Sequence, residues 1–562
     1  MKKNKEIVKK IKKNSKRIKT KYIFVVGGVM SSVGKGVAAA SIGTILQSKG
    51  YKVANIKCDM YVNIDAGTIR PAEHGEVFVG EDGVEADQDL GNYERFTGQI
   101  CTRDNYITTG QVYQEVIRRE RNLEYGGEDV EVVPDIPNEI IRRIKYCQKK
   151  NKSEIMITEF GGTVGEYQLL LFLEAARMMK AKDPDNVFFI MVSYLPTPKL
   201  LGEQKSKPTQ FAIRTLNSAG ISPDFILCRA ENPVTSDIKQ TISWICSLPK
   251  ERIISAPNIY SIYDVPVNFE KENFGNVLLN SIGLKSRKND LEEWKKLSRK
   301  IRIIEKKVTI GIVGKYFNFK SCRDTYISVI ESINHAAWAQ NKKPEIVWLD
   351  AEEYEKDKKK LKELSRLDGI IVPGGFGKRG TEGMILAAKY AREHKVPYFG
   401  LCFGMHILTI EFTRHVLKNN DVNSTEMNAE TKNPVICTME EQKELIKNCN
   451  YGGTMRLGAC PAKLSKDSIS YKAYKKSNIS ERHRHRYEFN NDYRKILQEN
   501  GLRIAGVNTK RNLVEIVEII NHPFMVGVQF HPEFSSWPLE PHPLFVEFVG
   551  ACLKERKKKG KM

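Results

Sequence analysis

A strand, a glycine-rich loop and a helix follow one another near the start of the chain, and this order constrains the fold more than any other feature. The apolar run KYIFVVGG is followed by the loop VMSSVGKG, by the amphipathic run VAAASIGTILQSKG and by a second apolar run, YKVANIKCD. Short apolar runs that alternate with helical stretches are typical of a parallel sheet with crossover helices. The sequence therefore predicts an α/β protein.

The alternation continues in two series, which predicts two tandem domains. Further strands of the first series are EIMITEF, NVFFIMVSYL and DFILCRA, and the second series contains VTIGIVGKY, EIVWLD, LDGIIVPGG, VPYFG and FMVGVQF. At roughly 100–200 residues per domain, 562 residues exceed a single core. We expect a basic tail at 1–20, a first domain at 21–285, a charged linker helix at 286–306, a second domain at 307–551 and a basic tail at 552–562. Each domain is predicted to be a mostly parallel sheet flanked by helices.

The net charge of +22 lies mostly in the two tails. Residues 1–21 hold 11 Lys or Arg against one Glu, and residues 554–562 hold six against one, so the tails carry 15 of the 22 charges. A folded basic face for nucleic acid is therefore not expected. The absence of any apolar run of 18 residues predicts a cytoplasmic protein without a membrane span. The N-terminal tail is either a transit peptide or a solvated tail, and its Lys-rich composition favours the second.

The loop at residues 27–36 has the composition of a phosphate-binding loop. Backbone N–H groups at the start of a helix can bind phosphate, and Lys35 can reach it. The spacing departs from the usual pattern, because five residues separate Gly28 from Gly34 and because Gly36 stands where Ser or Thr would bind magnesium. A plain glycine-rich turn is the alternative.

Magnesium ligands must then come from elsewhere, and two acids are candidates. Asp89 lies in ADQDLGNYERF, and Glu159 ends the predicted strand EIMITEF. Oxygen donors suit Mg²⁺, and the carboxyl end of a parallel strand is where nucleotides bind. Taken singly, each is more often a surface acid.

The segment KSKPTQ, residues 205–210, places two lysines one residue apart before a predicted helix. A second polyphosphate is a natural partner for this pair. An exposed basic loop is the alternative.

The segment GLCFG, residues 400–404, places a cysteine between an apolar strand and a helix. This context is typical of a nucleophile elbow with Cys402 in place of serine, and a helix N-terminus favours thiolate. His531 follows the strand VGVQF and can act as base, with Glu533 to orient it. The segment PGGFG, residues 373–377, can direct backbone N–H groups at an oxyanion. A buried structural cysteine is the alternative.

Taken together, PGG, G-x-C-x-G and HPE resemble the motifs of class I glutamine amidotransferases. The chain from Lys21 to Val549 resembles the CTP synthase family, as shown by GGVMSSVGKG, NIDAGT, HGEVFV, DLGNYERF, GGTVGE, KSKPTQ, VPGGFGKRGTEGM, NSTE, GGTMRLG and ERHRHRYE. The resemblance implies a P-loop-type synthetase domain followed by an amidotransferase domain. It also implies the last step of de novo CTP synthesis, in which ATP phosphorylates O4 of UTP, ammonia from glutamine attacks C4, and phosphate leaves.

The resemblance assigns roles around the nucleotides. The residues that it implies for ATP are Ser32, Val33, Gly34, Lys35, Gly36, Val37 and Asp89, with Mg²⁺ as cofactor on Asp89 and Glu159. Those implied for UTP or inhibitory CTP are Ser31, Glu166, Tyr167, Gln168, Lys205, Ser206, Lys207, Pro208, Thr209, Gln210 and Lys239. Lys57 would stabilise the phosphoryl group in transfer.

Roles in glutamine hydrolysis follow in the same way. Cys402 would form a glutamyl thioester, His531 would move the proton, and Glu533 would orient His531. The positions implied for glutamine are Gly375, Phe403, Gly404, Met405, His406, Glu426 and Arg486, with the N–H groups of Gly375 and Phe403 as the oxyanion hole. Arg379, Gly380 and Glu382 belong to a lid that links the activator GTP to hydrolysis. Such proteins form homotetramers and often filaments.

Several positions depart from the family pattern. Met60 stands where the family has Pro, and residues 134–137 read PDIP instead of PHIT, which leaves fine positioning in the nucleotide pocket open. His406 replaces Gln, and Thr241 replaces a Lys. Residues 161–168 read GGTVGEYQ where the family reads GGTVGDIE, so Gln168 replaces an acid that recognises CTP.

Two other classes of protein are alternatives. A cobyrinic-acid-type amidase would also combine a phosphate loop with an amidotransferase domain, but it gives no reason for KSKPTQ or RHRHR. A non-catalytic nucleotide-binding scaffold, such as a filament protein with its basic tails on RNA, is the second, and glutaminase activity abolished by Cys402→Ala would exclude it.

Overall fold

The chain forms two compact units in the computed structural model, which describes residues 19–200, 202–315, 322–448 and 451–559. Unit 1 comprises residues 1–62 and 104–292, and unit 2 comprises residues 63–103 and 293–562. Segment 63–103, which the sequence places inside the first domain, therefore packs with the second half of the chain. Among the helices of the described ranges, none combines the length and apolar character that crossing a bilayer requires.

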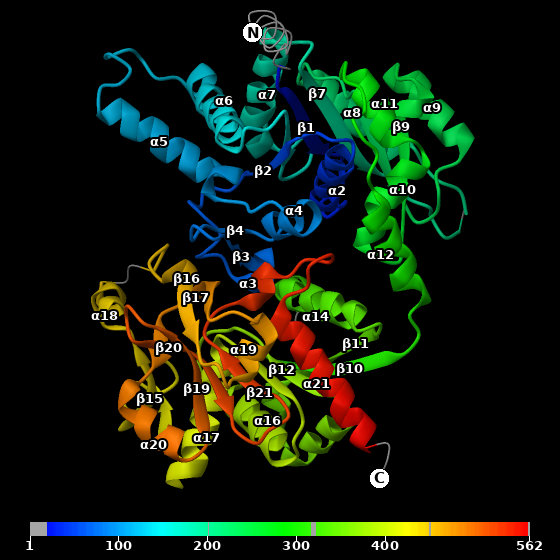
Figure 1. Cartoon of the computed structure of the whole chain (residues 1–562). Helices are drawn as coiled ribbons and strands as arrows, with labels where there is room; N and C mark the ends of the chain where they lie inside the picture. The colour runs from blue at the N-terminus through cyan, green and yellow to red at the C-terminus, as the bar shows by residue number, and fades with distance from the viewer. Residues whose placement is uncertain (1–18, 201, 316–321, 449–450, 560–562) are drawn as a thin grey trace, which may run out of the picture. The chain divides into compact units, whose positions relative to one another are not determined.

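Unit 1 is built on a seven-stranded sheet in the order β5-β2-β6-β1-β7-β8-β9. Figure 1 labels β1, β2, β7 and β9 of this sheet. Its strands are β1 (Lys21–Gly27), β2 (Val53–Asp59), β5 (Tyr106–Thr108), β6 (Ile155–Phe160), β7 (Val187–Tyr194), β8 (Phe225–Ala230) and β9 (Ile253–Pro257). All neighbouring strands are parallel, so their carboxyl ends meet at one edge of the sheet. The strands predicted in the first series are all present, and β1 lies at the centre.

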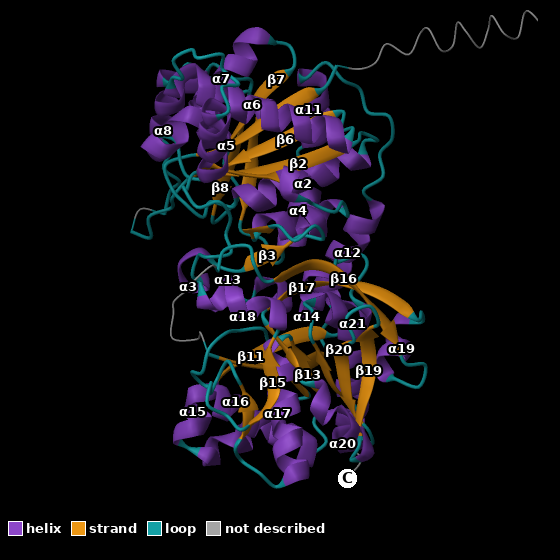
Figure 2. Ribbon diagram, turned by 90° about the vertical axis from the view of Figure 1, so that its left-hand side faces the viewer, coloured by secondary structure: helices purple, strands orange, loops and turns teal. Residues whose placement is uncertain are grey.

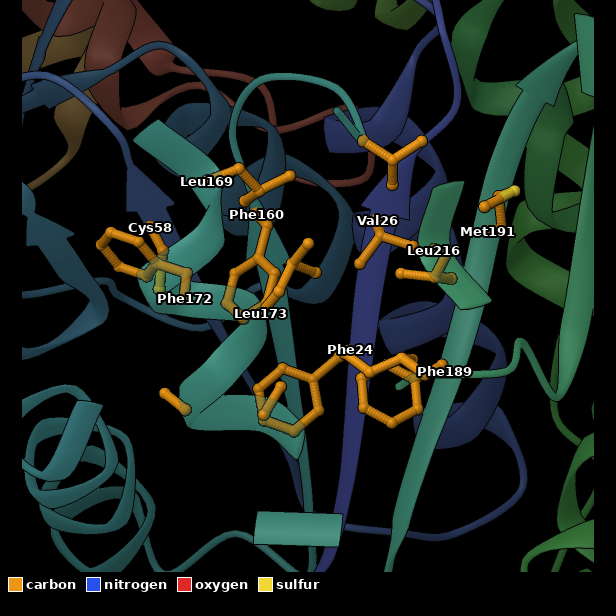
Figure 3. Close-up of a cluster of buried hydrophobic side chains, with 14 of the residues drawn as sticks. Phe24, Val26, Cys58, Phe160, Leu169, Phe172, Leu173, Phe189, Met191 and Leu216 are labelled. Atoms are coloured by element: carbon orange, nitrogen blue, oxygen red, sulfur yellow. The ribbon is translucent and has the colours of Figure 1, made fainter. Parts of the chain in front are cut away.

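Helices cover both faces of this sheet (Figure 2). They are α2 (Lys35–Ser48), α5 (Thr109–Arg121), α6 (Val132–Asn151), α7 (Leu170–Lys182), α8 (Lys207–Ser218), α9 (Ser236–Cys246), α10 (Val265–Lys271) and α11 (Phe274–Ser281). In the core of one face, the Phe24 ring lies 5.3 Å from Phe160 and 5.5 Å from Phe189 (Figure 3). Burial on both faces explains why these strands are continuous apolar runs.

Unit 2 contains a nine-stranded sheet in the order β11-β10-β12-β13-β21-β20-β19-β16-β17. The parallel part comprises β10 (Lys307–Gly314), β11 (Lys343–Asp350), β12 (Gly369–Val372), β13 (Tyr398–Leu401) and β21 (Met525–Val528). The antiparallel part comprises β16 (Arg456–Leu464), β17 (Asn478–His485), β19 (Leu502–Asn508) and β20 (Leu513–Ile519). A smaller sheet is formed by β14 (Val422–Ser424), β15 (Asn433–Thr438) and β18 (Tyr487–Phe489).

Two apolar cores lie against the main sheet of unit 2. The helices are α12 (Glu292–Ile303), α13 (Cys322–Thr325), α14 (Ile327–Ala339), α15 (Ala351–Lys356), α16 (Thr381–Glu393), α17 (Phe403–Leu417), α18 (Glu440–Lys447), α19 (Ile469–Tyr474), α20 (Arg494–Glu499) and α21 (Pro543–Lys559). Helix α12 lies in the predicted linker. Residues 552–559, which the sequence assigns to the basic tail, belong to helix α21. This helix carries the buried Phe548 and Cys552, so these residues are not a free tail.

Segment 63–103 forms α3 (Pro71–His74), β3 (Val77–Val79), β4 (Glu85–Asp87) and α4 (Asp89–Thr97). Two ion pairs join it to β17 within unit 2. Arg482 donates to Glu94 at 2.7 Å, and Arg484 donates to Glu85 at 2.8 Å. Both carboxylates are buried, which makes these pairs part of the interior of unit 2.

Candidate functional site

The glycine-rich loop leaves the carboxyl end of β1 and enters α2, as predicted. Gly34 is in the left-handed region with a φ of 86°, and α2 begins at Lys35. Lys35 Nζ donates to the carbonyl oxygen of Gly162 at 2.6 Å. A side chain at Gly27 would meet the backbone carbonyl oxygen of Gly162 at 2.9 Å, so the loop requires glycine there. The loop thus presents a helix N-terminus and a lysine at one place, a combination suited to phosphate.

An apolar cavity of about 240 Å³ lies beside this loop, and the sequence did not predict it. Gly34, Val37 and Arg229 line it, together with residues of β7, β8, β9 and α10. Arg229 donates to the carbonyl oxygens of Ala256 and Pro257, which fixes the position of its guanidinium. An apolar hollow beside a phosphate loop suits a nucleobase. Its lining comes from separated segments, so no local motif could have indicated it.

Lys57 and Glu159 lie at the same sheet edge. Lys57 Nζ contacts Glu159 Oε1 at 3.0 Å and Asp59 Oδ1 at 3.9 Å, and all three side chains are buried. Asp59 was not predicted as a site residue. Tyr106 donates to Asp59 Oδ2 at 3.1 Å. This cluster of carboxylate oxygens has the donor chemistry that Mg²⁺ prefers.

Asp89 begins α4 in unit 2. Its backbone N–H donates to Asp87 Oδ1 at 2.8 Å, and its own Oδ1 accepts from Asn92 at 3.1 Å. Asp87 Oδ2 lies 3.1 Å from His74 Nε2. Asp87 and His74 are thus polar neighbours of Asp89 that the sequence did not predict.

Glu166 and Gln168, two of the residues implied for CTP, contact each other. Glu166 Oε1 accepts from the backbone and hydroxyl of Thr163 at 2.8 and 2.7 Å, while Gln168 Nε2 donates to Glu166 Oε2 at 2.9 Å. Burial raises the pKa of Glu166, but the hydrogen bonds from Thr163 and the charge of Lys35 lower it on balance. Glu166 therefore lies close enough to Lys35 for the charge of the lysine to act on it. The Tyr167 side chain, by contrast, is 91% exposed.

The KSKPTQ segment leads into α8. Gln210 donates to Ser206 Oγ at 2.9 Å, and the Thr209 hydroxyl lies 2.8 Å from Ser193 on β7. Lys205 forms an ion pair with Glu203. Lys239 contacts Glu272 at 2.6 Å. Lys205 and Lys239 thus each have an acidic partner in this structure.

In unit 2, Cys402 lies between β13 and α17 with a φ of 49° and a ψ of −98°. A non-glycine residue with positive φ is strained, and the surrounding backbone must hold it. A side chain at Gly400 would meet the Gly404 carbonyl oxygen at 2.4 Å, and one at Gly404 would meet that of Val372 at 2.1 Å. Only glycine fits at either position, so the predicted elbow is present. The N–H of Phe403 opens α17 and has no intrahelical partner.

His531 follows β21, and its Nδ1 lies 2.7 Å from Glu533 Oε1. Burial by itself lowers the pKa of His531, but the charges of Glu533 and Cys402 raise it to about 10 on balance. The imidazole is therefore protonated at neutral pH. A side chain at Gly374 would meet His531 Cε1 at 2.8 Å, so this glycine lets the β12 loop approach the ring.

A cavity of about 80 Å³ joins the elements of this second site. Its lining includes Cys402, His531, Glu533, Gly374, Gly375, Phe376, Arg484, and Glu76 from segment 63–103. Burial raises the pKa of Glu76 to about 7, and this carboxylate accepts from the backbone and hydroxyl of Ser328. Glu76 and Arg484 were not predicted as site residues, because they reach the cavity from distant parts of the sequence.

Glu426 and Arg486, implied for glutamine, are not among the residues that line this cavity within the described ranges. Glu426 accepts from the Gly377 N–H at 2.8 Å, and burial raises its pKa. Arg486 donates to Gln442 at 2.7 Å and to the Tyr451 carbonyl oxygen at 2.6 Å. Met405 and His406 are buried on α17.

Two ion pairs involve residues 379–382, which the resemblance implies as a lid. Arg379 contacts Glu352 at 3.1 Å, and Glu382 contacts Arg414 at 2.7 Å. Lys315, which was not predicted, donates to the Gly377 carbonyl oxygen at 2.7 Å and lies 4.3 Å from the centre of the Phe403 ring. Burial lowers the pKa of Lys315 to about 8. Lys315 thus contacts both Gly377, which precedes residues 379–382, and the first residue of α17.

Comparisons with protein families match both halves of the chain. A family described as "CTP synthase N-terminus" matches residues 21–284, and "Glutamine amidotransferase class-I" matches residues 321–551.

Curated relatives align over nearly the full length. The CTP synthase of Clostridium kluyveri is 47% identical over 541 residues, which cover 96% of this chain and 99% of the relative. The CTP synthase of Carboxydothermus hydrogenoformans is 47% identical over 539 residues, with the same coverage of both chains. Among solved structures, the glutaminase domain of Trypanosoma brucei CTPS with bound acivicin is 39% identical and covers 44% of this chain and 94% of that one, with a TM-score of 0.41.

Proposed function

This chain belongs to the CTP synthase family, and we propose that it converts UTP to CTP with ATP and with ammonia taken from glutamine. The resemblance read from the motifs is confirmed by the family match. The observation that carries the proposed chemistry is the strained Cys402 in one cavity with the His531–Glu533 pair. The roles proposed for individual residues are supported by this geometry and by the family resemblance.

In the proposed glutaminase reaction, Cys402 thiolate attacks the amide carbon of glutamine. A C–S bond forms as the carbonyl π electrons move to oxygen, where the N–H groups of Gly375 and Phe403 would stabilise the negative charge. Protonated His531 gives its proton to the leaving nitrogen, and the C–N bond breaks to release ammonia. Water, deprotonated by His531, then hydrolyses the thioester to glutamate. Glu533 holds the imidazole in orientation throughout.

In the proposed synthetase reaction, the γ-phosphoryl group passes from ATP to O4 of UTP. Lys35 and the loop N–H groups would bind the ATP phosphates, and the apolar cavity next to Gly34 would accept the adenine base. Lys57 would stabilise the phosphoryl group in transfer. Ammonia then attacks C4, and phosphate leaves with its bonding electrons. The basic segment 205–210 and Lys239 would hold the UTP triphosphate, because phosphate can displace their present acidic partners.

Asp89 and Glu159 are the proposed Mg²⁺ ligands. The buried carboxylate of Glu159 beside Asp59 supports this role, since hard oxygen donors suit the ion. When bound, Mg²⁺ would neutralise charge on the phosphate oxygens. We further propose GTP as activator through the lid, CTP as feedback inhibitor at Glu166 and Gln168, and a homotetramer as the assembly.

The decisive experiment compares the two nitrogen sources. Cys402→Ala should abolish CTP formation from glutamine and leave formation from free ammonia nearly intact, because the thiolate serves only to release ammonia. CTP is measured by chromatography at saturating UTP and ATP. Cys460→Ala is a matched control, because Cys460 lies on β16 and is absent from the cavity lining. If Cys402→Ala lost CTP formation equally with both nitrogen sources, the proposal that Cys402 serves only to release ammonia would be wrong.

A further inference from the structure

A buried glutamine lies between the nucleophile and a histidine of the elbow helix. Gln529 Nε2 lies 3.8 Å from Cys402 Sγ, and Gln529 Oε1 lies 3.0 Å from His406 Nε2. Gln529 is 1% exposed and His406 is 2% exposed. The three side chains thus form a continuous polar contact inside unit 2, although Gln529 is 127 residues from Cys402 in sequence.

The chemistry of the three groups fixes the direction of both hydrogen bonds. A thiolate can only accept, so the NH₂ end of Gln529 must face the sulfur. The amide oxygen then faces His406, which must donate through a protonated Nε2. His406 therefore decides which end of the amide faces Cys402. A side chain without a donor at position 406 would leave the amide free to rotate.

We propose that His406 is a positioning residue for glutamine hydrolysis, which holds the Gln529 amide so that its N–H stabilises the Cys402 thiolate. This role rests on the proposed function of Cys402 as nucleophile. The bond to sulfur adds to the charge of His531, and a donor aimed at an anion favours the charged form.

The surroundings of His406 support a neutral ring that acts as a donor. Burial lowers the pKa of His406 to about 4, although the hydrogen bond to Gln529 opposes this. Four other titratable or charged groups lie near this region. His485 and Arg456 come from the antiparallel strands, His531 lies beside the Cys402 sulfur, and Glu533 pairs with His531. Burial also lowers the pKa of His485 well below its usual value. Neither imidazole therefore gains charge near neutral pH.

The second nitrogen of His406 argues against a purely structural role. Among the described residues, no hydrogen-bond partner reaches the buried Nδ1 of His406. A buried polar atom without a partner is costly. An apolar side chain at position 406 would fill the core without leaving a polar atom unpaired. The need for an N–H donor to Gln529 explains why a histidine stands there despite the unpaired Nδ1.

The test is the pH dependence of alkylation of Cys402 by iodoacetamide, followed by mass spectrometry of the Cys402 peptide. His406→Phe keeps a ring and removes the donor. Its alkylation midpoint should move up by about one pH unit, a ten-fold loss of thiolate at a given pH. His406→Gln keeps an N–H donor and should hold the midpoint within a few tenths of a unit. His522→Phe is a matched control, because His522 is also a buried histidine, and it donates to the Ala391 carbonyl oxygen. His522 precedes β21, whereas the site lies after the other end of that strand.

Gln529→Met provides a second route if His406→Phe fails to fold. It should show the same upward shift, and adding His406→Phe to Gln529→Met should cause no further shift if the two residues act in series. Glutaminase kcat should fall in both single variants with KM changed less, because the lost contact is to the nucleophile. Thermal unfolding identifies variants that are merely unstable.

Two outcomes would overturn the inference. If the midpoint stayed unchanged in folded His406→Phe and Gln529→Met while Cys402→Ala still lost glutaminase activity, the nucleophile would stand and the positioning role would be refuted. If Cys402→Ala retained glutaminase activity, the proposed function would fail and the positioning role with it.

Discussion

Arg414 holds the carboxylate of Glu382 through two hydrogen bonds of 2.7 and 3.0 Å. Arg414 lies in the last turn of α17, the helix that begins directly after Cys402, and Glu382 lies in the first turn of α16. Both backbones are held by their helices. The residues implied as a lid are therefore tied to the far end of the helix that begins after Cys402.

Arg414→Gln should weaken GTP activation of glutamine hydrolysis. The substitution removes the charged partner of Glu382. The residues implied as a lid are then no longer held against α17 when little GTP is bound. The pair is partly exposed, so we expect the GTP concentration for half-maximal activation to rise only about two- to five-fold. Lys389→Gln, an exposed change on α16, is the control. An unchanged GTP response in Arg414→Gln would separate this ion pair from activation.

Asp89→Asn and Glu159→Gln should each stop CTP formation from either nitrogen source, since phosphoryl transfer depends on the metal. Glutaminase activity alone should survive in both variants. Titration with Mg²⁺ measures the loss as a higher metal requirement. Glu154→Gln, a partly exposed acid at the amino end of β6 that pairs with Arg287, serves as the matched control. Near-normal CTP formation from ammonia in both site variants would show that the metal is held elsewhere.

Gln168→Glu should tighten inhibition by CTP. The substitution replaces a neutral acceptor by a carboxylate, and the difference between a charge-assisted and a neutral hydrogen bond is about 1 kcal/mol, or several-fold in the inhibition constant. It also removes the bond from Gln168 Nε2 to Glu166 Oε2, which leaves that oxygen free for the ligand. The KM for UTP should change less. Inhibition no tighter than that of the native protein would make Gln168 a neutral replacement.

The raised pKa of His531 predicts a pH dependence of stability. Its folded value of about 10 lies above the unfolded value of about 6.5, so the folded state binds this proton more tightly. The resulting stabilisation is fully present below pH 6.5 and is lost as pH rises through about 10. The Tm difference between the native protein and His531→Gln should therefore be largest below pH 6.5 and shrink towards pH 10. A difference that is constant from pH 6 to pH 10 would contradict a protonated His531.

The sequence indicated the parallel strands and the elbow because both depend on local patterns. Continuous apolar runs form buried strands, and the glycines around Cys402 are required by backbone contacts within a few residues of the turn. The CTP synthase fold class and activity followed from motifs of the same local kind. These predictions required no knowledge of distant contacts.

What the sequence did not indicate arises from contacts between distant segments. The antiparallel strands β16 and β17 contain polar and charged residues, so apolar runs did not mark them. Gln529 contacts Cys402, which lies 127 residues away in the sequence. Lys239 on α9 donates to Glu272, which follows α10. The packing of segment 63–103 with unit 2 has the same cause. No spacing rule connects such pairs, because the tertiary fold alone brings them together.

The Glu94–Arg482 pair spans 388 residues of sequence, and this separation bears on how the protein is made. During synthesis, segment 63–103 leaves the ribosome long before β17 exists to receive it. Glu94 must stay hydrated until then, since a buried carboxylate without its cation is strongly unfavourable. The intervening residues 104–292 form unit 1 together with residues 1–62, and their folding shortens the flexible loop that the pair must close. Unit 2 therefore completes its interior only when nearly the whole chain has been translated, and the early folding of unit 1 makes that late closure less costly.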